Sequence, residues 1–344
     1  MPRDAVTRSS LVVGSRGLLG RSLVAELRGR GDDVATVSVP WSDEEAAGEE
    51  LARALERLVA TASDDVAVWW CAGAGVTATP QHVLDAELRT LERFVDDVRR
   101  IVGGASARRR TLFYSSSAGG VFAGSQEPPF TELTTPAPLA PYGHAKLRAE
   151  AMVSSLADAG IGVAIGRLAN IYGPGQDLAK PQGLISQLCL AHHTARPINV
   201  YVSLDTLRDY IFVDDAARLC ADLGDAASPR SGTSAMPPVA ADEASKGDAD
   251  AGGAVVGAAV VKIIASGRAA SIGALIADMR RLFKRRVPVV LAASPYARQQ
   301  ARDLRLRSVV LPEIDQQPLV TLINGIDRVN EDIGAQFRAG VLDR

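Results

Sequence analysis

Short apolar runs alternate with helical patterns through the first half of the chain. The run SSLVVG (9–14) precedes the helical pattern LLGRSLVAELRGRG (18–31), which repeats an apolar residue on one face. Further apolar runs lie at 32–39, 64–73, 110–117 and 161–170, with long helical patterns at 82–102 and 142–160. Short apolar runs of this kind are typical of strands that are covered on both faces. The alternation therefore predicts an α/β fold, a doubly wound parallel sheet of Rossmann type.

The pattern changes between residues 225 and 253. This stretch holds almost no large apolar residue, so burial cannot repay the entropy cost of ordering it. Strand and helix patterns resume after it, which predicts a flexible surface loop rather than a domain boundary. The helical pattern at 271–286 ends in the basic cluster RRLFKRR, which either complements the helix dipole or attracts an anion.

Charge and composition exclude several classes of partner. The 344 residues carry a formal net charge of −2, which gives no electrostatic reason to expect nucleic acid or an anionic membrane. No segment approaches the roughly 20 apolar residues that a membrane span requires. Cys71, Cys189 and Cys220 are too few and too far apart for a disulfide framework or a cysteine-based zinc site, and the histidines lack ligand-like spacing. We therefore expect a cytoplasmic globular protein without a metal site.

Three glycines, Gly14, Gly17 and Gly20, separate the first predicted strand from the first predicted helix. Without a Cβ at Gly14 and Gly17, the backbone can turn sharply and approach a pyrophosphate, whose charge the helix N-terminus favours. The G-x-x-G-x-x-G spacing taken alone is equally compatible with a packed turn. The candidate cofactor contacts in this loop are Gly14, Ser15, Arg16, Gly17, Leu18, Leu19 and Gly20.

The segment PYGHAKLRAE places Tyr142 and Lys146 four residues apart at the start of a predicted helix, so both side chains lie on one face. A tyrosine, with a reference pKa of about 10, is a poor acid or base at neutral pH. A neighbouring ammonium stabilises the phenolate and so lowers the pKa of the tyrosine toward the pH at which the protein works. The pair predicts a general acid/base or, alternatively, two exposed residues on a surface helix.

Three serines, Ser115, Ser116 and Ser117, end the predicted strand at 110–117. A hydroxyl at this position can hydrogen-bond a substrate carbonyl or alcohol that faces the tyrosine. Serines also commonly do no more than cap the end of a strand.

Taken together and in this order, these elements resemble the extended short-chain dehydrogenase/reductase superfamily, in particular its NAD(P)-dependent nucleotide-sugar epimerases, dehydratases and reductases. The resemblance covers nearly the whole chain. It rests on VVGSRGLLG, WCAGAG, YSSSAGGVF, PYGHAKLRAE, GRLANIYGPGQ and LRDYIFVDDAARL. It implies a Rossmann-type cofactor domain with a smaller C-terminal substrate-binding domain.

The resemblance also assigns roles to individual residues. The glycine loop would bind the cofactor pyrophosphate, and Ala72 and Gly73 would lie along the cofactor. Tyr142 would be the catalytic acid/base. Lys146 would bind the nicotinamide ribose and lower the pKa of the tyrosine.

The family's catalytic hydroxyl would be Ser117, with Ser116 as the second candidate and a possible substrate contact. Two positions depart from the family pattern. Phe122 stands where a tyrosine is common, with one extra residue separating it from Ser117, and Trp70 stands where a histidine is frequent. The tryptophan predicts a more apolar environment before the Ala-Gly segment.

The resemblance places Ala169 and Asn170 at the border of nicotinamide and substrate. Arg208 occupies a position that often contacts the phosphates of a nucleotide substrate. The structural alternative for Arg208 is a salt bridge with Asp209 or Asp214, and the sequence does not decide between the two.

The predicted domains are a cofactor domain (1–171, with returning segments near 211–222 and 258–266) and a substrate domain (172–210 and 267–344). The expected function is hydride transfer at a carbon of a nucleotide sugar, leading to epimerisation, dehydration or reduction. One alternative is a reductase or dehydrogenase of a small non-nucleotide carbonyl or alcohol. Another is a non-catalytic dinucleotide-binding sensor, against which the presence of both Tyr142 and Lys146 argues.

The end of the second predicted strand favours NADP over NAD. NAD-selective folds of this type place an acidic residue there to bind the ribose 2′-hydroxyl, whereas this chain has Ser38, and its first acid, Asp43, comes later. Arg16 lies in the glycine loop, where a guanidinium can bind a 2′-phosphate. The alternatives are that Arg16 pairs with a carboxylate and that Asp43 folds back onto the ribose.

The long apolar stripe from Leu84 to Val102, together with Ala145, Ala149 and Val153, is more than one sheet face requires. The corresponding helices pair two subunits in this superfamily, so we expect a twofold homodimer. The alternative is a stripe wholly buried against the sheet.

Overall fold

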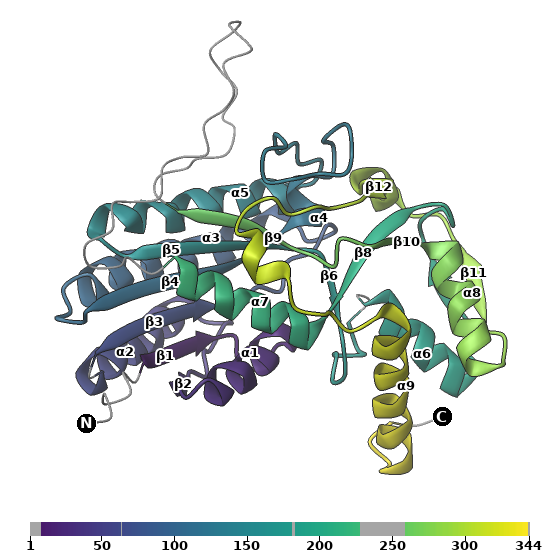
Figure 1. Ribbon diagram of the computed structural model, residues 1–344, viewed down its shortest axis with the longest axis horizontal. Coiled ribbons are helices and arrows are strands. Elements are labelled where there is room, and N and C mark those ends of the chain that lie inside the picture. Colours follow the sequence, from purple (N-terminus) through teal and green to yellow (C-terminus); the bar gives the residue numbers. More distant parts are fainter. Residues whose placement is uncertain (1–7, 63, 181–182, 228–258, 343–344) are drawn as a thin grey trace, which may run out of the picture.

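A six-stranded parallel sheet forms the centre of the larger part of the computed structural model, which describes residues 8–62, 64–180, 183–227 and 259–342 (Figure 1). Its strand order is β2-β1-β3-β4-β5-β9. The strands are β1 (Arg8–Val13), β2 (Asp33–Thr36), β3 (Asp65–Trp70), β4 (Arg109–Ser117), β5 (Gly162–Leu168) and β9 (Val260–Ile264). The predicted doubly wound parallel sheet is confirmed. The strand order reverses between β1 and β3, which is where such sheets bind ligands.

Two sets of helices cover the two faces of this sheet. One face packs against α1 (Leu18–Gly29) and α7 (Val213–Ala226), and the short α4 (Ala118–Val121) follows β4. The other face packs against α2 (Glu44–Thr61), α3 (Gln81–Asp97) and α5 (Pro141–Ser154). Successive strand residues alternate between the two cores, as Trp69 and Trp70 do.

The apolar stripe of α3 is buried within the chain. The helix predicted at 82–102 is α-helical to Asp97 and ends in a single π-helical turn, Val98–Val102. Its stripe residues are at most 5% exposed: Leu84, Leu88, Leu91, Val95, Val98 and Val102. They pack in one core with α2, α5 and the sheet. The stripe therefore gives no support for a second copy of the chain, and the homodimer stays a prediction.

A smaller group of elements has its own core and extends to one side of the sheet (Figure 1). It contains β6 (Asn170–Tyr172), α6 (Leu184–Thr194), β7 (Ile198–Val200), β8 (Leu207–Phe212), β10 (Ala269–Ser271), α8 (Ile272–Phe283), β11 (Val289–Leu291), β12 (Asp303–Leu304) and α9 (Leu322–Arg338). β8 pairs with β10, β12 and β6, and β11 pairs with β7. Of the loop predicted at 225–253, residues 228–253 lie outside the described part, and 225–227 end α7.

A buried lysine ties the last strand of the large sheet to the C-terminal region. Lys262 is fully buried in β9, and its Nζ donates to Ser308 Oγ at 2.6 Å, Val310 O at 2.6 Å and Asp315 Oδ2 at 2.7 Å. Three acceptors therefore satisfy the three ammonium protons. Glu132 accepts hydrogen bonds from the next backbone amide of β9 and from the segment around residue 309.

A second buried ion pair fixes α5 on the sheet. Glu150 of α5 accepts a bidentate pair of hydrogen bonds from Arg167 of β5, with Nη2–Oε2 at 2.7 Å and Nε–Oε1 at 3.1 Å. Ser116 Oγ of β4 donates to the same carboxylate at 2.5 Å. Both charged side chains are less than one-tenth exposed. This pair holds the helix that carries Tyr142 and Lys146 in register with β4 and β5.

Removing one partner of this pair is expected to destabilise the fold strongly. Glu150→Ala leaves the Arg167 guanidinium buried without its carboxylate, which should lower the free energy of unfolding by about 3–5 kcal/mol. The double variant Glu150→Met/Arg167→Met removes both charges, so its free energy of unfolding should fall much less. Urea unfolding followed by circular dichroism measures both, and a single variant as stable as the wild type would contradict this role.

Candidate active site

The glycine loop packs directly against the segment that follows β3. Gly14 has a left-handed φ of +84°, and an added Cβ would lie 2.6 Å from Ala72 N. The first turn of α1 is close behind, because Gly17 N donates to Gly14 O at 3.0 Å. No side chain caps the N-terminus of α1, so its first amides can bind an anion. The loop is a tight turn that also fits a cofactor pyrophosphate.

Arg16 and Ser38 are both exposed and lie beside each other at the edge of this loop. Arg16 Nη2 donates to Ser38 Oγ at 3.5 Å, and within the described residues Arg16 pairs with no carboxylate. The Asp43 carboxylate caps α2, where it accepts from Ala46 N at 3.0 Å. The pairing considered for Arg16 is therefore not seen in the described residues, whereas the alternative contact between Asp43 and a bound ribose is not tested.

Two glycines form a slot for the ring of Tyr142 at the start of α5. An added Cβ at Gly120, in α4, would lie 3.0 Å from Tyr142 Cε1. An added Cβ at Gly75, after β3, would lie 3.4 Å from Tyr142 Cδ2 on the other edge of the ring. The Gly120 contact is too tight for a side chain and the Gly75 contact is ordinary van der Waals packing, so the ring lies closely between these two segments.

Lys146 lies one helical turn beyond Tyr142, half-buried. Its Nζ donates to Tyr114 Oη at 3.2 Å and to Ser115 O at 3.1 Å, and it lies 5.8 Å from the centroid of the Tyr142 ring. Desolvation acts to lower the pKa of Lys146, but the neighbouring Tyr114 and Tyr142 oxygens outweigh it, and the pKa is raised above its ordinary value. An added Cβ at Gly73 would lie 3.8 Å from Nζ. The ammonium therefore faces the segment that packs on the glycine loop.

The structure distinguishes the two candidate serines. Ser116 is 3% exposed, and its hydroxyl donates to the Glu150 carboxylate on the α5 face of the sheet. Ser117 is partly exposed, and its Oγ accepts from Gly120 N at 3.1 Å. Ser117 and Tyr142 thus share Gly120 as a neighbour. Because Ser117 Oγ accepts this bond, its own proton remains available to a substrate oxygen.

The residues predicted near the substrate lie where the large sheet meets the smaller group of elements. Ala169 is buried and its backbone N donates to Ile264 O of β9 at 2.9 Å, whereas Asn170 Nδ2 donates to Asp209 O of β8 at 2.9 Å. Arg208 donates to Ala301 O at 2.7 Å and to Gln300 Oε1 at 3.2 Å. Burial lowers the pKa of Arg208 from its ordinary value.

Arg208 forms no salt bridge with Asp209 or Asp214 in the described part of the chain, so that alternative is wrong. The Asp209 carboxylate accepts from Ser266 N at 2.8 Å, and Asp214 accepts from Ser22 Oγ at 3.0 Å. Arg208 therefore carries a positive charge with neutral partners.

Tyr114 is the site residue that the sequence did not reveal. It precedes the three serines in β4, is 3% exposed and binds Lys146 through its hydroxyl. Burial raises the pKa of this phenol above its ordinary value, against the opposing effect of Lys146. A strand residue that faces a helix lysine is only recognised once the helix is placed on the sheet.

The two departures from the family pattern lie in the hydrophobic cores. Trp70 packs on Phe94 with ring centroids 4.6 Å apart, and Trp69 packs on Phe113 at 5.7 Å. Phe122 is fully buried and stacks on Phe130 at 5.6 Å. The apolar environment predicted at Trp70 is therefore present.

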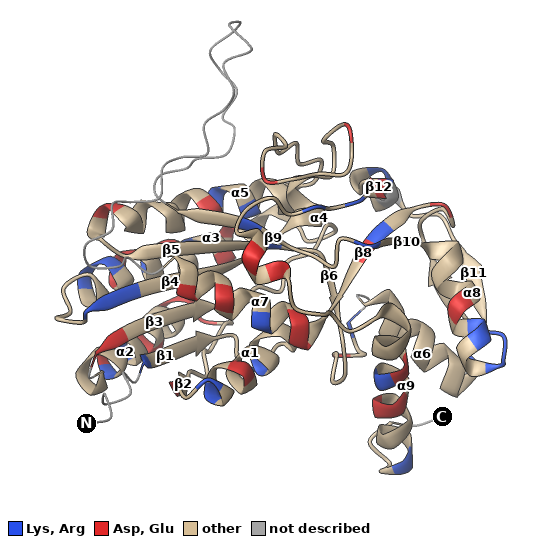
Figure 2. Ribbon diagram, viewed as in Figure 1, with Lys and Arg blue, Asp and Glu red and all other residues tan. Residues whose placement is uncertain are grey.

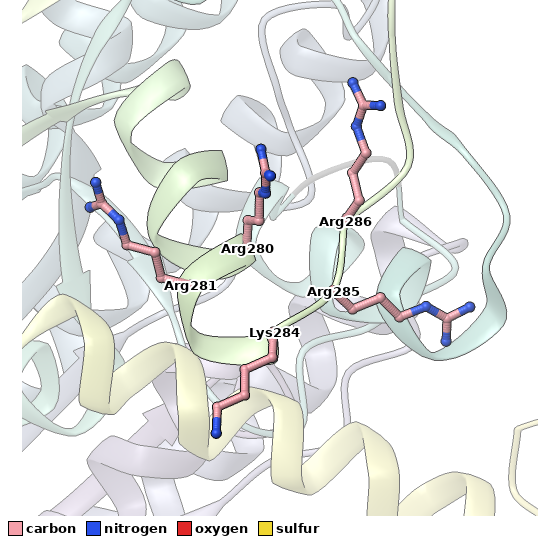
Figure 3. Close-up of a pocket in the computed structure, with 5 residues that line it drawn as sticks. All are labelled: Arg280, Arg281, Lys284, Arg285 and Arg286. Atoms are coloured by element: carbon pink, nitrogen blue, oxygen red, sulfur yellow. The ribbon is translucent and has the colours of Figure 1, made fainter.

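The basic cluster at the C-terminal end of α8 lies apart from these residues, at the far end of the smaller group of elements (Figure 2). An open hollow of about 540 Å³ is lined there by Arg280, Arg281, Lys284, Arg285 and Arg286. The five side chains point in different directions rather than toward one point, as Figure 3 shows. Arg281 pairs with Asp278 at 3.0 Å. This arrangement is typical of a solvated helix end that complements the dipole.

Metal-binding clusters and membrane-spanning helices are both absent from the described residues. No group of three or more His, Cys, Asp or Glu side chains there is arranged to hold a metal ion. No helix in that part of the chain is both long and apolar enough to cross a membrane.

A model of the NAD dependent epimerase/dehydratase family matches residues 10–231. The chain belongs to this family. The membership of the extended short-chain dehydrogenase/reductase superfamily, a class of NAD(P)-dependent enzymes, that the sequence predicted is therefore confirmed.

A curated relative, dTDP-4-dehydro-6-deoxyglucose reductase of Escherichia coli, is 32% identical over 100 residues. This match covers 29% of the present chain and only 32% of the reductase.

Solved structures of nucleotide-sugar enzymes share the fold over almost the whole chain. MoeE5 in complex with UDP-glucuronic acid and NAD superposes with a TM-score of 0.73 at 21% identity, covering 95% of this chain and 99% of that one. UDP-glucose 4-epimerase of Thermotoga maritima, with UDP-glucose, superposes with a TM-score of 0.71 at 20% identity, covering 97% and 100%. These likenesses confirm the Rossmann-type architecture.

The Gly14 contact predicts a specific loss of cofactor binding. Gly14→Ala introduces a Cβ that collides with Ala72 N, so the dissociation constant for NADPH or NADH should rise at least about tenfold. Gly31→Ala is the matched control, since Gly31 also has a positive φ of +92° but nothing within 4 Å of an added Cβ. It should cost stability through backbone strain, roughly 1 kcal/mol, and leave binding intact. Fluorescence titration measures both, and equal losses would mean that strain alone is responsible.

Proposed function

We propose that this protein oxidises or reduces a carbon of the sugar ring of a nucleotide sugar, using NAD(P) and Tyr142 as the general acid/base. The supporting observation is an unbroken set of contacts across the site. The glycine loop touches Ala72, Gly73 faces Lys146, and Gly75 and Gly120 enclose Tyr142. These contacts put a pyrophosphate cradle, an ammonium and a phenol in one place.

The protein's own residues supply binding and proton transfer. The amides at the start of α1 would hold the cofactor pyrophosphate, with Lys146 on the ribose. When bound, the nicotinamide supplies and accepts hydride at the substrate carbon. The Tyr142 hydroxyl donates its proton to the substrate oxygen as a carbonyl is reduced and takes it back as an alcohol is oxidised. The Ser117 hydroxyl donates a hydrogen bond to the same oxygen.

The substrate class is supported by Arg208 and by the relatives. Arg208 is a buried cation bound to neutral oxygens, and such a group gains most from an anionic phosphate. Solved structures with this fold contain UDP-glucose and UDP-glucuronic acid. We assign substrate binding to residues 172–210 and 267–344, whose helices α6, α8 and α9 share a separate core, and cofactor binding to 1–171 with 211–222 and 258–266. Asn170 and Ala169 lie where these parts meet.

The acid/base assignment predicts the effect of removing one oxygen atom. Tyr142→Phe preserves the ring in its glycine slot and should reduce turnover by roughly 10²–10⁴. The assay is a panel of UDP-, dTDP- and GDP-sugars with NAD⁺, NADP⁺ and their reduced forms, followed by chromatography of products. NADPH affinity should change little. A fully active Tyr142→Phe enzyme, or an enzyme that turns over only non-nucleotide carbonyl compounds, would refute the proposal.

We further propose that the cofactor is NADP in preference to NAD. Arg16 and Ser38 present a guanidinium and a hydroxyl at the strand end where NAD-selective proteins carry an acid. Arg16→Ala should weaken NADPH binding by roughly tenfold to a hundredfold and leave NADH binding unchanged. Arg28→Ala, which removes the same charge at the other end of α1, is the control. Isothermal titration measures the dissociation constants of both cofactors. If the wild type binds NADH more tightly than NADPH, and Arg16→Ala leaves NADH binding unchanged, the preference is for NAD.

A further inference from the structure

A carboxylate that neither the sequence patterns nor the family assignment singled out faces the Tyr142 slot from α3. Glu87 Oε1 accepts from Ala74 N at 3.0 Å, in the turn after β3. An added Cβ at Gly75 would lie 3.3 Å from Glu87 Oε2 and 3.4 Å from Tyr142 Cδ2. The carboxylate and the edge of the phenol therefore border the same small space. In the described chain, Glu87 has no cation within salt-bridge distance.

The titratable groups around Tyr142 come from three elements. Lys146 lies on its own helix, Tyr114 faces it from β4, and Glu87 faces it from α3, whereas α4 contributes only small apolar residues and glycines. Tyr114 is neutral at neutral pH, because burial raises its pKa. Among these groups, Glu87 is thus the carboxylate whose negative charge acts on the Lys146 ammonium.

One further carboxylate is close, but another residue neutralises it. Glu150 lies behind Tyr114, where it is bound to Arg167 in the buried ion pair. The ion pair with Arg167 neutralises the charge of Glu150, which leaves Glu87 as the group to test.

We infer that Glu87 is a positioning residue for Tyr142, holding the turn at Ala74 against the ring edge and opposing ionisation of the phenol with its own negative charge. The inference rests on the proposed acid/base role of Tyr142 and adds which direction of proton transfer, donation or acceptance, the surroundings of the phenol favour. By favouring the protonated phenol, Glu87 favours the form that donates a proton, which is the form needed to reduce a carbonyl.

The test measures ionisation of Tyr142 directly, without a substrate. The tyrosinate absorbance near 295 nm is titrated against pH in the full-length protein, and subtracting the Tyr142→Phe titration isolates this one phenol. Glu87→Gln keeps an oxygen that can accept from Ala74 N but removes the charge. The midpoint should then shift to lower pH by roughly 0.5 to 1 unit, a threefold to tenfold change in the ionisation constant. A midpoint that is unchanged or higher overturns the inference.

Asp85→Asn is the matched control. Asp85 lies two residues earlier on α3 and pairs with Arg148 at 3.3 Å, outside the slot. In Asp85→Asn, the midpoint of the Tyr142 titration should stay within about 0.2 pH units of the wild-type midpoint, because solvent and salt screen an exposed charge. An equal shift in both variants would mean a general effect of net charge and would overturn the assignment.

Glu87→Asp guards against a structural explanation. It keeps the charge but shortens the reach to Ala74 N, so its midpoint should remain close to wild type even if the turn loosens. A shift as large as that of Glu87→Gln would overturn the inference. The proposed function fails separately, through an active Tyr142→Phe enzyme, since the titration needs no turnover.

Discussion

The close approach of the Gly14 backbone to the amide of Ala72 fixes the distance between the ends of β1 and β3, and the site is laid out from that contact. The four residues that begin at Ala72 meet the glycine loop, then Lys146, and then the ring of Tyr142. Each meeting occurs at a residue with no side chain or a very small one. A single short segment therefore relates the position of a bound pyrophosphate to the position of the acid/base.

The features that could be predicted from the sequence are those that depend only on residues close together in the chain. Strand and helix periodicity, the glycine spacing and the four-residue separation of Tyr142 and Lys146 are local, and the structure shows them as expected. The choice between Ser116 and Ser117 depended on which strand face α5 covers, which is a matter of packing. Tyr114 and Glu87 reach the site only through tertiary contacts, so no local pattern marks them. The apolar stripe of α3 was equally ambiguous, since hydrophobicity does not reveal which surface will bury it.

The two hydrophobic cores also determine the surroundings of the site at the end of β3. Trp69 and Trp70 fill opposite faces of the sheet immediately before the segment that contacts the cofactor loop. Their burial stiffens the end of β3 at the point where Cys71 and Ala72 turn toward Gly14. Fold alone does not define the reaction. The reaction proposed for this chain depends instead on the polar atoms of Lys146, Tyr142 and Ser117.

Lys262 has a consequence for the order in which the chain assembles during synthesis. Five strands of the large sheet are complete once the ribosome has made residue 168, but the outer edge of β5 stays unpaired until β9 is made. Even then, the ammonium of Lys262 lacks its acceptors until the segment around residues 308–315 has emerged. Completing the sheet is thus a late event that requires most of the chain, and until then the nascent protein exposes the unpaired edge of β5, which is prone to aggregation.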